Sequence, residues 1–209
     1  MCHKLYDKWG DKMEKEMYVL GLVMTDGFKN KGQYCIELKK EDENVLLQIS
    51  EDFATNLYRR TRDTNFAKDF SCTKLVIKDN LLTSLLDKFI PQEDKTNNAY
   101  VPNPFLFSPS LWRGILDGDG CYGYRKGTPY ISFTTKSEKL KEAFCILVEQ
   151  ITGQKINATR NQRDNIYNLG VTSVNAKKLV KWLLSVDTFY IQRKKDIMES
   201  IVNWQPSGK

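Results

Sequence analysis

Two segments of the chain place the same residue types at matching positions. Residues 18–27 read YVLGLVMTDG and residues 111–120 read LWRGILDGDG. The residues that recur at one offset of 93 are Gly21 and Gly114, Asp26 and Asp119, and Gly27 and Gly120. A single Asp-Gly pair is usually only a turn, but two copies at a fixed offset indicate an internal repeat. The two aspartates are therefore the first candidates for chemistry.

Small residues within each copy indicate how the two segments meet. Gly21 and Thr25 are four residues apart, as are Gly114 and Gly118, so each pair lies on one face of a helix. Small side chains at that spacing let a second helix backbone approach closely. The sequence therefore predicts that the two repeated helices pack against each other and form the interface between two halves.

The position of the aspartates favours a metal ion. Asp26 and Asp119 fall at the C-terminal ends of the predicted helices, each before a glycine suited to the left-handed conformation that follows many helices. The helix dipole disfavours a carboxylate there, and two neighbouring carboxylates raise each other's pKa. A divalent cation relieves both effects, and oxygen ligands suit Mg²⁺. We therefore expect Asp26 and Asp119 to share a magnesium site.

The elements around each copy repeat as well. In the first half we expect strands over 33–39, 57–62 and 72–78, with helices around 45–53 and over 80–89; acidic residues 41–43 would favour the start of the first of these helices. In the second half we expect strands over 122–126, 129–134, 155–160 and 166–171, with helices over 137–151, 175–184 and 192–203. The fold class is then α+β, with two pseudo-symmetric αββαββα halves over 1–95 and 110–209 and a proline-containing linker over 96–109.

Composition excludes several kinds of site. His3 is the sole histidine, which argues against zinc hydrolases, histidine-dependent nucleases and Ser-His or Cys-His triads. The five cysteines are scattered and form no CxxC pattern, as expected for reduced thiols in an intracellular protein. No signal peptide or membrane-spanning segment is predicted, so we expect an intracellular, non-secreted protein with no membrane partner.

The charge is unevenly distributed. Residues 1–100 hold 16 Lys and Arg against 17 Asp and Glu, whereas residues 101–209 hold 16 against 9, so the halves carry −1 and +7. A basic half is compatible with a polyanionic partner without requiring one.

The two repeated segments resemble the paired motifs of the LAGLIDADG homing endonucleases, in the monomeric branch that carries both motifs in one chain. Residues 112–120 are close to the usual form of the motif; the first copy is looser, since Met24 and Thr25 replace more usual residues, but it retains Asp26. The resemblance implies a site-specific DNA endonuclease whose two sheets form a saddle on the major groove of a long asymmetric target of about 20 base pairs. It also implies Mg²⁺-dependent cleavage of both strands, four-base 3′ overhangs, Mn²⁺ as a substitute, and Ca²⁺ binding without cleavage.

The resemblance further implies basic residues beside the carboxylates and a DNA-reading set on the strands. Lys95 matches the first basic position, and Arg193 or Lys194, with Lys194 preferred, matches the second. The expected DNA-binding residues are Arg59, Arg60, Arg62, Lys74, Lys78, Tyr124, Arg125, Lys126, Tyr130, Ser132, Thr134, Lys155, Asn157, Thr159, Arg160, Gln162, Arg163, Asn165, Tyr167 and Asn168. Alternation along strands would place about half of them on one face.

Other functions remain open at this point. The same fold could serve as a group I intron RNA splicing factor or as a DNA-binding protein that does not cut, although both aspartates are retained. A carboxylate–metal hydrolase of small molecules is disfavoured by the basic second half and the polar strands. Because both halves are present in one chain, we expect a monomer.

Overall fold

The first half is a four-stranded antiparallel sheet with helices against it. This computed structural model describes residues 10–53, 55–62 and 70–206 of the chain. Its first-half elements are α2 (Asp11–Thr25), β1 (Gly27–Asn30), β2 (Gln33–Lys39), η1 (Lys40–Asp42), α3 (Glu43–Asp52), β3 (Thr55–Arg62), β4 (Phe70–Ile77) and α4 (Asn80–Phe89). The strand order is β1-β2-β4-β3, and every neighbouring pair is antiparallel. The predicted order of elements is confirmed, with β1 as a further short strand.

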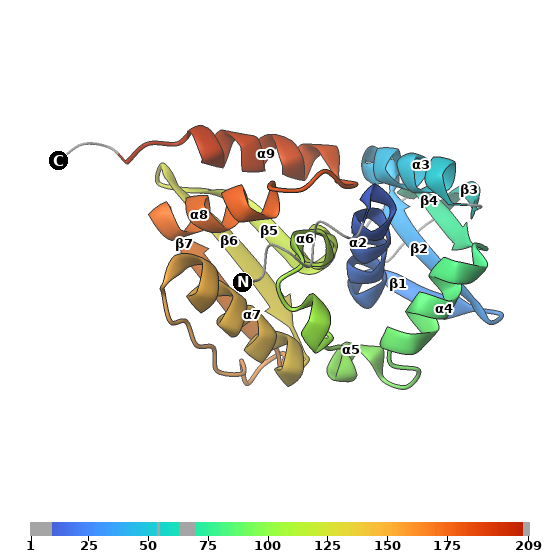
Figure 1. Cartoon of the computed structure of the whole chain (residues 1–209), viewed down its shortest axis with the longest axis horizontal. Coiled ribbons are helices and arrows are strands. Elements are labelled where there is room, and N and C mark those ends of the chain that lie inside the picture. The colour runs from blue at the N-terminus through green and yellow to red at the C-terminus, as the bar shows by residue number, and fades with distance from the viewer. Residues whose placement is uncertain (1–9, 54, 63–69, 207–209) are drawn as a thin grey trace.

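The second half repeats this plan with one strand fewer in the described residues. Its elements are α6 (Pro109–Asp119), β5 (Gly120–Arg125), β6 (Thr128–Thr135), α7 (Glu138–Thr152), β7 (Tyr167–Thr172), α8 (Ser173–Leu183) and α9 (Gln192–Asn203). The sheet has the order β5-β6-β7. Figure 1 shows the two halves on either side of a central pair of helices, α2 and α6.

The strand expected over 155–160 is wrong. Only Arg160 pairs with β7, through an isolated antiparallel bridge to Tyr167. The Asn157 side chain accepts a hydrogen bond from the backbone N–H of Ala158 at 2.9 Å, and Asn161 donates its own N–H to the Ile166 carbonyl at 2.7 Å. These local bonds compete with a regular ladder.

Both sheets begin with a tight hairpin of the same type. Lys31 and Gly32 connect β1 to β2, and Lys126 and Gly127 connect β5 to β6. All four residues have positive φ, between 49° and 79°, which is what a two-residue type I′ turn requires. Glycine at the second position adopts this conformation without steric cost. The repeat thus extends beyond the Asp-Gly segments into the hairpins.

The hydrophobic core runs through both halves and encloses the central helices. Residues Met17 to Met24 of α2 are all buried, as are residues Pro109 to Asp117 of α6. A helix that is covered on nearly all sides needs apolar residues around most of its circumference, and α6 in addition buries three polar side chains, Ser110, Arg113 and Asp117. The α2–α6 pair therefore fixes the relative position of the halves.

The connection between the halves contains two short helical turns. α4 ends before Pro91, and the chain then forms α5 (Lys95–Asn98) and η2 (Asn103–Phe105) before α6. Ser108 begins α6 by accepting a hydrogen bond from the Leu111 N–H. No helix within the described ranges is long and apolar enough to cross a bilayer.

Candidate active site and nucleic-acid interface

Two of the predicted interface glycines, Gly21 and Gly114, lie at reciprocal backbone contacts. A Cβ on Gly21 would lie 2.2 Å from the Leu111 carbonyl oxygen, and a Cβ on Gly114 would lie 2.1 Å from the Tyr18 carbonyl oxygen. Tyr18 and Leu111 are themselves equivalent in the repeat. The helices therefore cross on a pseudo-two-fold axis at a separation that only glycine permits at these positions.

The other two predicted interface residues, Thr25 and Gly118, lie against each other across the helix pair. A Cβ on Gly118 would lie 1.9 Å from the Thr25 hydroxyl oxygen and 3.2 Å from Asp26 Oδ2. Thr25 donates its hydroxyl hydrogen to the Leu22 carbonyl at 3.0 Å, so its side chain folds back onto its own helix. Gly118 leaves the space that Thr25 occupies and keeps the region next to Asp26 uncrowded.

The glycines after the aspartates have a different role from the one expected. Gly120 has φ −101°, and Gly27 is not among the residues with positive φ, so neither adopts the left-handed conformation. A Cβ on Gly27 would lie 2.6 Å from Val23 Cα, and one on Gly120 would lie 2.5 Å from the Leu116 carbonyl oxygen. Each glycine instead lets a strand start directly against the last turn of its helix.

At the end of the helix pair, Asp26 perturbs the ionisation of Asp119. The surrounding protein desolvates the Asp119 carboxyl, and repulsion from Asp26 adds to this, which raises the pKa of Asp119 to about 6 even though its side chain faces solvent. Desolvation also raises the pKa of Asp26, against the opposing attraction of Lys194 and Lys95. The two acidic groups therefore lie close enough to interact, as predicted from the repeat.

Lys95 and Lys194 take equivalent places around the two helix ends. The Lys95 ammonium donates to the carbonyls of Val23 and Thr25 at 2.9 and 2.7 Å and to that of Gly27 at 2.5 Å. Burial lowers the pKa of Lys95, while attraction to Asp119 and Asp26 opposes this.

The second lysine has the same type of partners. Lys194 donates to the carbonyls of Leu116, Asp117 and Gly120 at 3.0, 2.5 and 2.8 Å. Leu116 and Gly120 are the repeat equivalents of Val23 and Gly27. Each lysine thus satisfies carbonyls at the end of a central helix and brings a positive charge to the carboxylates.

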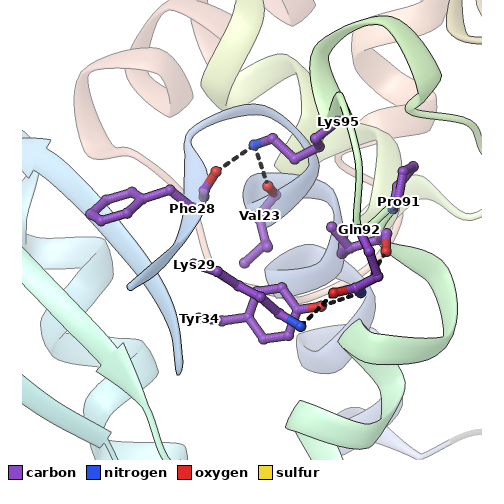
Figure 2. Close-up of a pocket in the computed structure, with 9 residues that line it drawn as sticks. Val23, Phe28, Lys29, Tyr34, Pro91, Gln92 and Lys95 are labelled. Atoms are coloured by element: carbon purple, nitrogen blue, oxygen red, sulfur yellow. Dashed lines mark hydrogen bonds between the residues drawn. The ribbon is translucent and has the colours of Figure 1, made fainter. Parts of the chain in front are cut away.

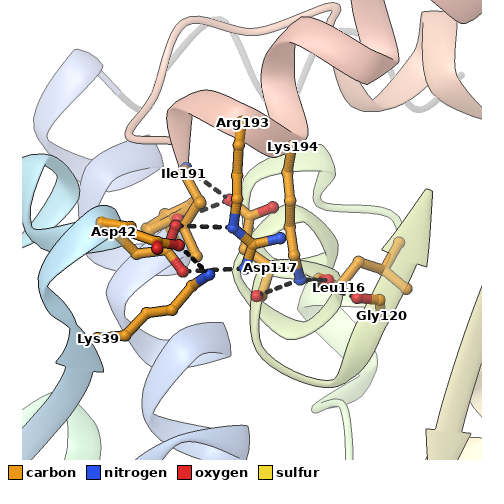
Figure 3. A network of polar contacts seen from close by, with 10 residues as sticks. Lys39, Asp42, Leu116, Asp117, Gly120, Ile191, Arg193 and Lys194 are labelled. Carbon is orange, nitrogen blue, oxygen red and sulfur yellow. Dashed lines mark hydrogen bonds and ion pairs between the residues drawn. The ribbon is translucent and has the colours of Figure 1, made fainter. Parts of the chain in front are cut away.

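Arg193 and Lys194, the two candidates for the second basic residue of the site, point in different directions. Lys194 faces α6, whereas Arg193 turns to the first half and forms a two-point ion pair with Asp42 (Figure 3). Asp42 was expected only to favour the start of α3. It makes no capping hydrogen bond and instead holds Arg193.

A cleft lies beside Lys95, between β1 and the segment that follows α4. It has a volume of about 230 Å³ and is lined by Val23, Gly27, Phe28, Lys29, Tyr34, Ile90, Pro91, Gln92 and Lys95. Figure 2 shows that the Lys29 ammonium and the Gln92 side chain meet beside the Tyr34 hydroxyl, and the ammonium lies 4.5 Å from the centre of the Tyr34 ring. The Lys29 ammonium also pairs with Asp87 at 2.8 Å, so these polar groups satisfy one another.

In the first sheet, alternation divides the predicted DNA-binding residues between two faces. Arg59 lies on the face covered by α3, where its guanidinium and the Thr73 hydroxyl both bind the Glu43 carboxylate. Arg60 and Lys74 lie on the opposite face, where Arg60 pairs with Glu37 and the Lys74 ammonium lies 5.4 Å from the centre of the Phe28 ring. Lys78 is exposed just after β4. The Arg62 side chain is outside the described residues.

The second sheet divides its residues in the same way. Its open face carries Arg125, Tyr130, Ser132, Thr134 and Asn168 from the predicted set. Tyr167 is buried on the helix-covered face. Tyr124 is also on that side, where its hydroxyl lies 3.1 Å from the Ser200 hydroxyl of α9. Lys126 is exposed in the hairpin turn.

The remaining predicted residues are exposed in the segment before β7. They are Lys155, Asn157, Thr159, Arg160, Gln162, Arg163 and Asn165. Arg160 is held in place, since its guanidinium donates to Asn165 at 3.1 Å and to the Lys136 carbonyl at 3.0 Å. Arg163 pairs with its neighbour Asp164 at 2.9 Å.

Two groups near the site were not singled out from the sequence. The Tyr18 hydroxyl donates to Asp117 Oδ2 at 2.7 Å across the two central helices, and burial raises the pKa of Asp117. Phe28, with 39% of its surface exposed, lies on the open face of the first sheet. Asp117 was recognisable as a carboxylate within the second repeated segment; the exposure of Phe28 had no sequence signal because β1 is only four residues long.

Comparison with known proteins agrees with this geometry. The profile of the LAGLIDADG-like domain family matches residues 109–183. No curated protein sequence matches the chain. Among solved structures, the homing endonuclease I-WcaI bound to its DNA recognition sequence is similar, with a TM-score of 0.62 and 11% identity over 94% of this chain and 93% of that one.

Two further structures show that the fold is shared by differently named proteins. Mesophilic variants of the homing endonuclease I-DmoI are similar with a TM-score of 0.58 and 13% identity, over 91% of this chain and all of that one, 100%. The N-terminal LAGLIDADG domain of DUF199/WhiA is similar with a TM-score of 0.53 and 13% identity, over 86% of each chain. Residues 109–183 match the LAGLIDADG-like domain family, and the chain as a whole, with its two equivalent helices in contact, shares the fold of these solved structures.

Proposed function

We propose that the protein is a site-specific DNA endonuclease that cuts both strands of a long asymmetric target in a reaction that depends on Mg²⁺. The observation that supports this most strongly is the placement of Asp26 and Asp119 at the ends of the contacting helices, each with a lysine beside it. Solved relatives add support, since I-WcaI is described bound to its recognition sequence and I-DmoI in complex with DNA and Mn.

The carboxylates of Asp26 and Asp119 are suitable ligands for a hard divalent cation such as Mg²⁺, although they are only two. No group of three or more His, Cys, Asp or Glu side chains in the described part of the chain could hold a metal ion. Mg²⁺, however, usually keeps several waters and takes only one or two protein carboxylates together with phosphate oxygens. Desolvation and repulsion from Asp26 raise the pKa of Asp119, and a bound cation would relieve both effects, which supports the proposal.

Each group of the site then has a task in phosphodiester hydrolysis. Asp26 and Asp119 would hold the cation, which supplies an activated water and stabilises the leaving oxygen when bound. Lys95 and Lys194 keep the ends of the central helices in place and bring positive charge to the region where the phosphates would lie. The open faces of the two sheets would bind the base edges on either side, and the two halves in one chain would act as a monomer.

The proposal can be tested without knowing the target. A randomised duplex library is selected for binding in Ca²⁺, and the enriched sequence is then incubated with Mg²⁺, with Mn²⁺, or with a chelator. We expect a long asymmetric consensus, cleavage of both strands only with Mg²⁺ or Mn²⁺, and four-base 3′ overhangs. An enriched sequence that is bound but never cut with either metal would overturn the endonuclease.

A second candidate is DNA binding without cleavage. The similarity to the LAGLIDADG domain of DUF199/WhiA, whose name carries no nuclease activity, favours this alternative. Selection would then still give a consensus, but the metal would have no effect on the DNA. Binding only to structured RNA in the same assay would favour the splicing-factor function instead.

A further inference from the structure

The first turn of α9 holds Lys194 in the site and also contacts the opposite half of the protein. We propose that Asp42 of the first half is a positioning residue, which fixes Lys194 of the second half by holding its neighbour Arg193. This inference rests on the proposed function for its catalytic consequence. Its structural part concerns only the start of α9 and can be measured separately.

The contact itself is a two-point ion pair between the halves. Arg193 Nε lies 2.8 Å from Asp42 Oδ1, and Arg193 Nη2 lies 2.9 Å from Asp42 Oδ2. Parallel bonds of this kind fix orientation as well as distance. The Asp42 side chain is only 6% exposed, so it is largely removed from water and depends on Arg193 to offset that cost.

A second carboxylate holds the same turn from the other side. Asp117 of α6 accepts a hydrogen bond from the Ile191 N–H at 3.1 Å, and Ile191 is the N-cap residue directly before α9. Figure 3 shows the start of α9 between Asp42 and Asp117, with the Lys194 ammonium directed to the α6 carbonyls. The position of Lys194 is therefore determined by one carboxylate from each half.

Lys95, the equivalent lysine, is held differently. It is the first residue of α5, and the second half reaches this element through the Ser137 hydroxyl, which donates to the Ala99 carbonyl at 2.5 Å. That hydrogen bond involves no charged group. It is made by the N-cap residue of α7, and α7 is the repeat equivalent of α3. Loss of the Asp42 charge should consequently disturb Lys194 and leave Lys95 in place.

This difference predicts an effect on only one DNA strand. Each lysine lies at the end of one central helix, so each would serve mainly one scissile phosphate. In Asp42→Asn we expect one strand to be cut between about ten- and a hundredfold more slowly, the range that small misplacements of catalytic groups produce. The other strand should be cut at the rate of the unmodified protein.

The same helix provides a matched control. Asp52 lies at the opposite end of α3 and forms an ion pair with Lys15. Asp52→Asn removes one carboxylate and one ion pair at the C-terminal end of α3, as Asp42→Asn does just before its N-terminal end, but the Asp52–Lys15 pair includes no residue of α9. The variant Asp42→Glu keeps a carboxylate at residue 42. It should therefore cut the affected strand faster than Asp42→Asn does.

The test uses a selected duplex labelled differently on each strand, and amide hydrogen exchange of the free protein. We expect Asp42→Asn to accumulate a product nicked in one strand and to exchange the Lys194 and Lys195 amides faster, since both donate to the Ile191 carbonyl at 3.0 Å. Asp52→Asn should do neither. Equal slowing of both strands, or unchanged exchange at these amides, would overturn the inference. If the unmodified protein cuts no DNA, the proposed function fails, and the exchange measurement still decides whether Asp42 positions the start of α9.

Discussion

Replacing Asp119 by asparagine should stabilise the metal-free protein at neutral pH. The pKa of Asp119 is raised from its usual 3.8 to about 6 by desolvation and by repulsion from Asp26. A group whose charged form is disfavoured in the folded state lowers stability wherever it is ionised. Asp119→Asn removes that charge with little change in volume and should therefore relieve the cost.

The size of the effect follows from the two pKa values. The difference between 3.8 and 6 corresponds to at most about 3 kcal/mol. Because the Asp119 side chain is exposed to solvent, screening reduces this to about 1 kcal/mol. The gain should be complete above pH 6, decline as the pH falls, and vanish below about pH 3.8, where the carboxyl is protonated in both folded and unfolded states.

Urea denaturation of the metal-free protein at pH 7.5 and at pH 4 measures this directly. Asp164→Asn is the control, because the Asp164 carboxylate pairs with Arg163 and should give no gain on removal. Added Mg²⁺ should stabilise the unmodified protein and have less effect on Asp119→Asn. A loss of stability in Asp119→Asn at pH 7.5, or a gain that persists unchanged at pH 4, would refute the reasoning.

Three further predictions concern the helix interface, the DNA-binding faces and the basic residues. Gly114→Ala should destabilise the protein by about 3 kcal/mol in urea denaturation, because its Cβ would lie 2.1 Å from a backbone oxygen, whereas Gly170→Ala, whose nearest neighbour is 3.9 Å away, should change stability by less than about 0.5 kcal/mol. Arg60→Ala should weaken DNA binding and reduce its salt dependence in a titration with the selected duplex, and Arg59→Ala, on the helix-covered face, should not. Lys95→Met should lower the single-turnover cleavage rate more than DNA affinity; a loss of affinity alone would contradict its placement at the carboxylates.

Much of the fold follows from local sequence signals. The helix expected over 192–203 is α9 with the same bounds, and Ser137 begins α7 by accepting the Leu140 N–H as its residue type suggests. The contact between α2 and α6 also followed from the sequence. Both repeated helices carry small residues four positions apart, and the simplest explanation is that the two helices pack against each other. These features depend on propensity, capping and spacing, which the sequence contains directly.

Features that depend on distant partners could not be predicted in the same way. Asp42 and Arg193 are separated by 151 positions, and nothing in the pattern around either residue indicates the other. The segment 155–160 alternates like a strand, but hydrogen bonds from its own side chains and the turn after it prevent the ladder. The role of Gly27 and Gly120 was misjudged because a glycine needed for a close approach looks the same in sequence as one needed for a left-handed turn.

The most direct test of the central claim is strand-resolved cleavage of the selected duplex, in Mg²⁺, by the unmodified protein and by Asp26→Asn and Asp119→Asn. If the two carboxylates act together at the ends of the paired helices, each variant should bind the duplex specifically but fail to make the double-strand break. Full cutting of both strands by either variant would contradict a site built from Asp26 and Asp119.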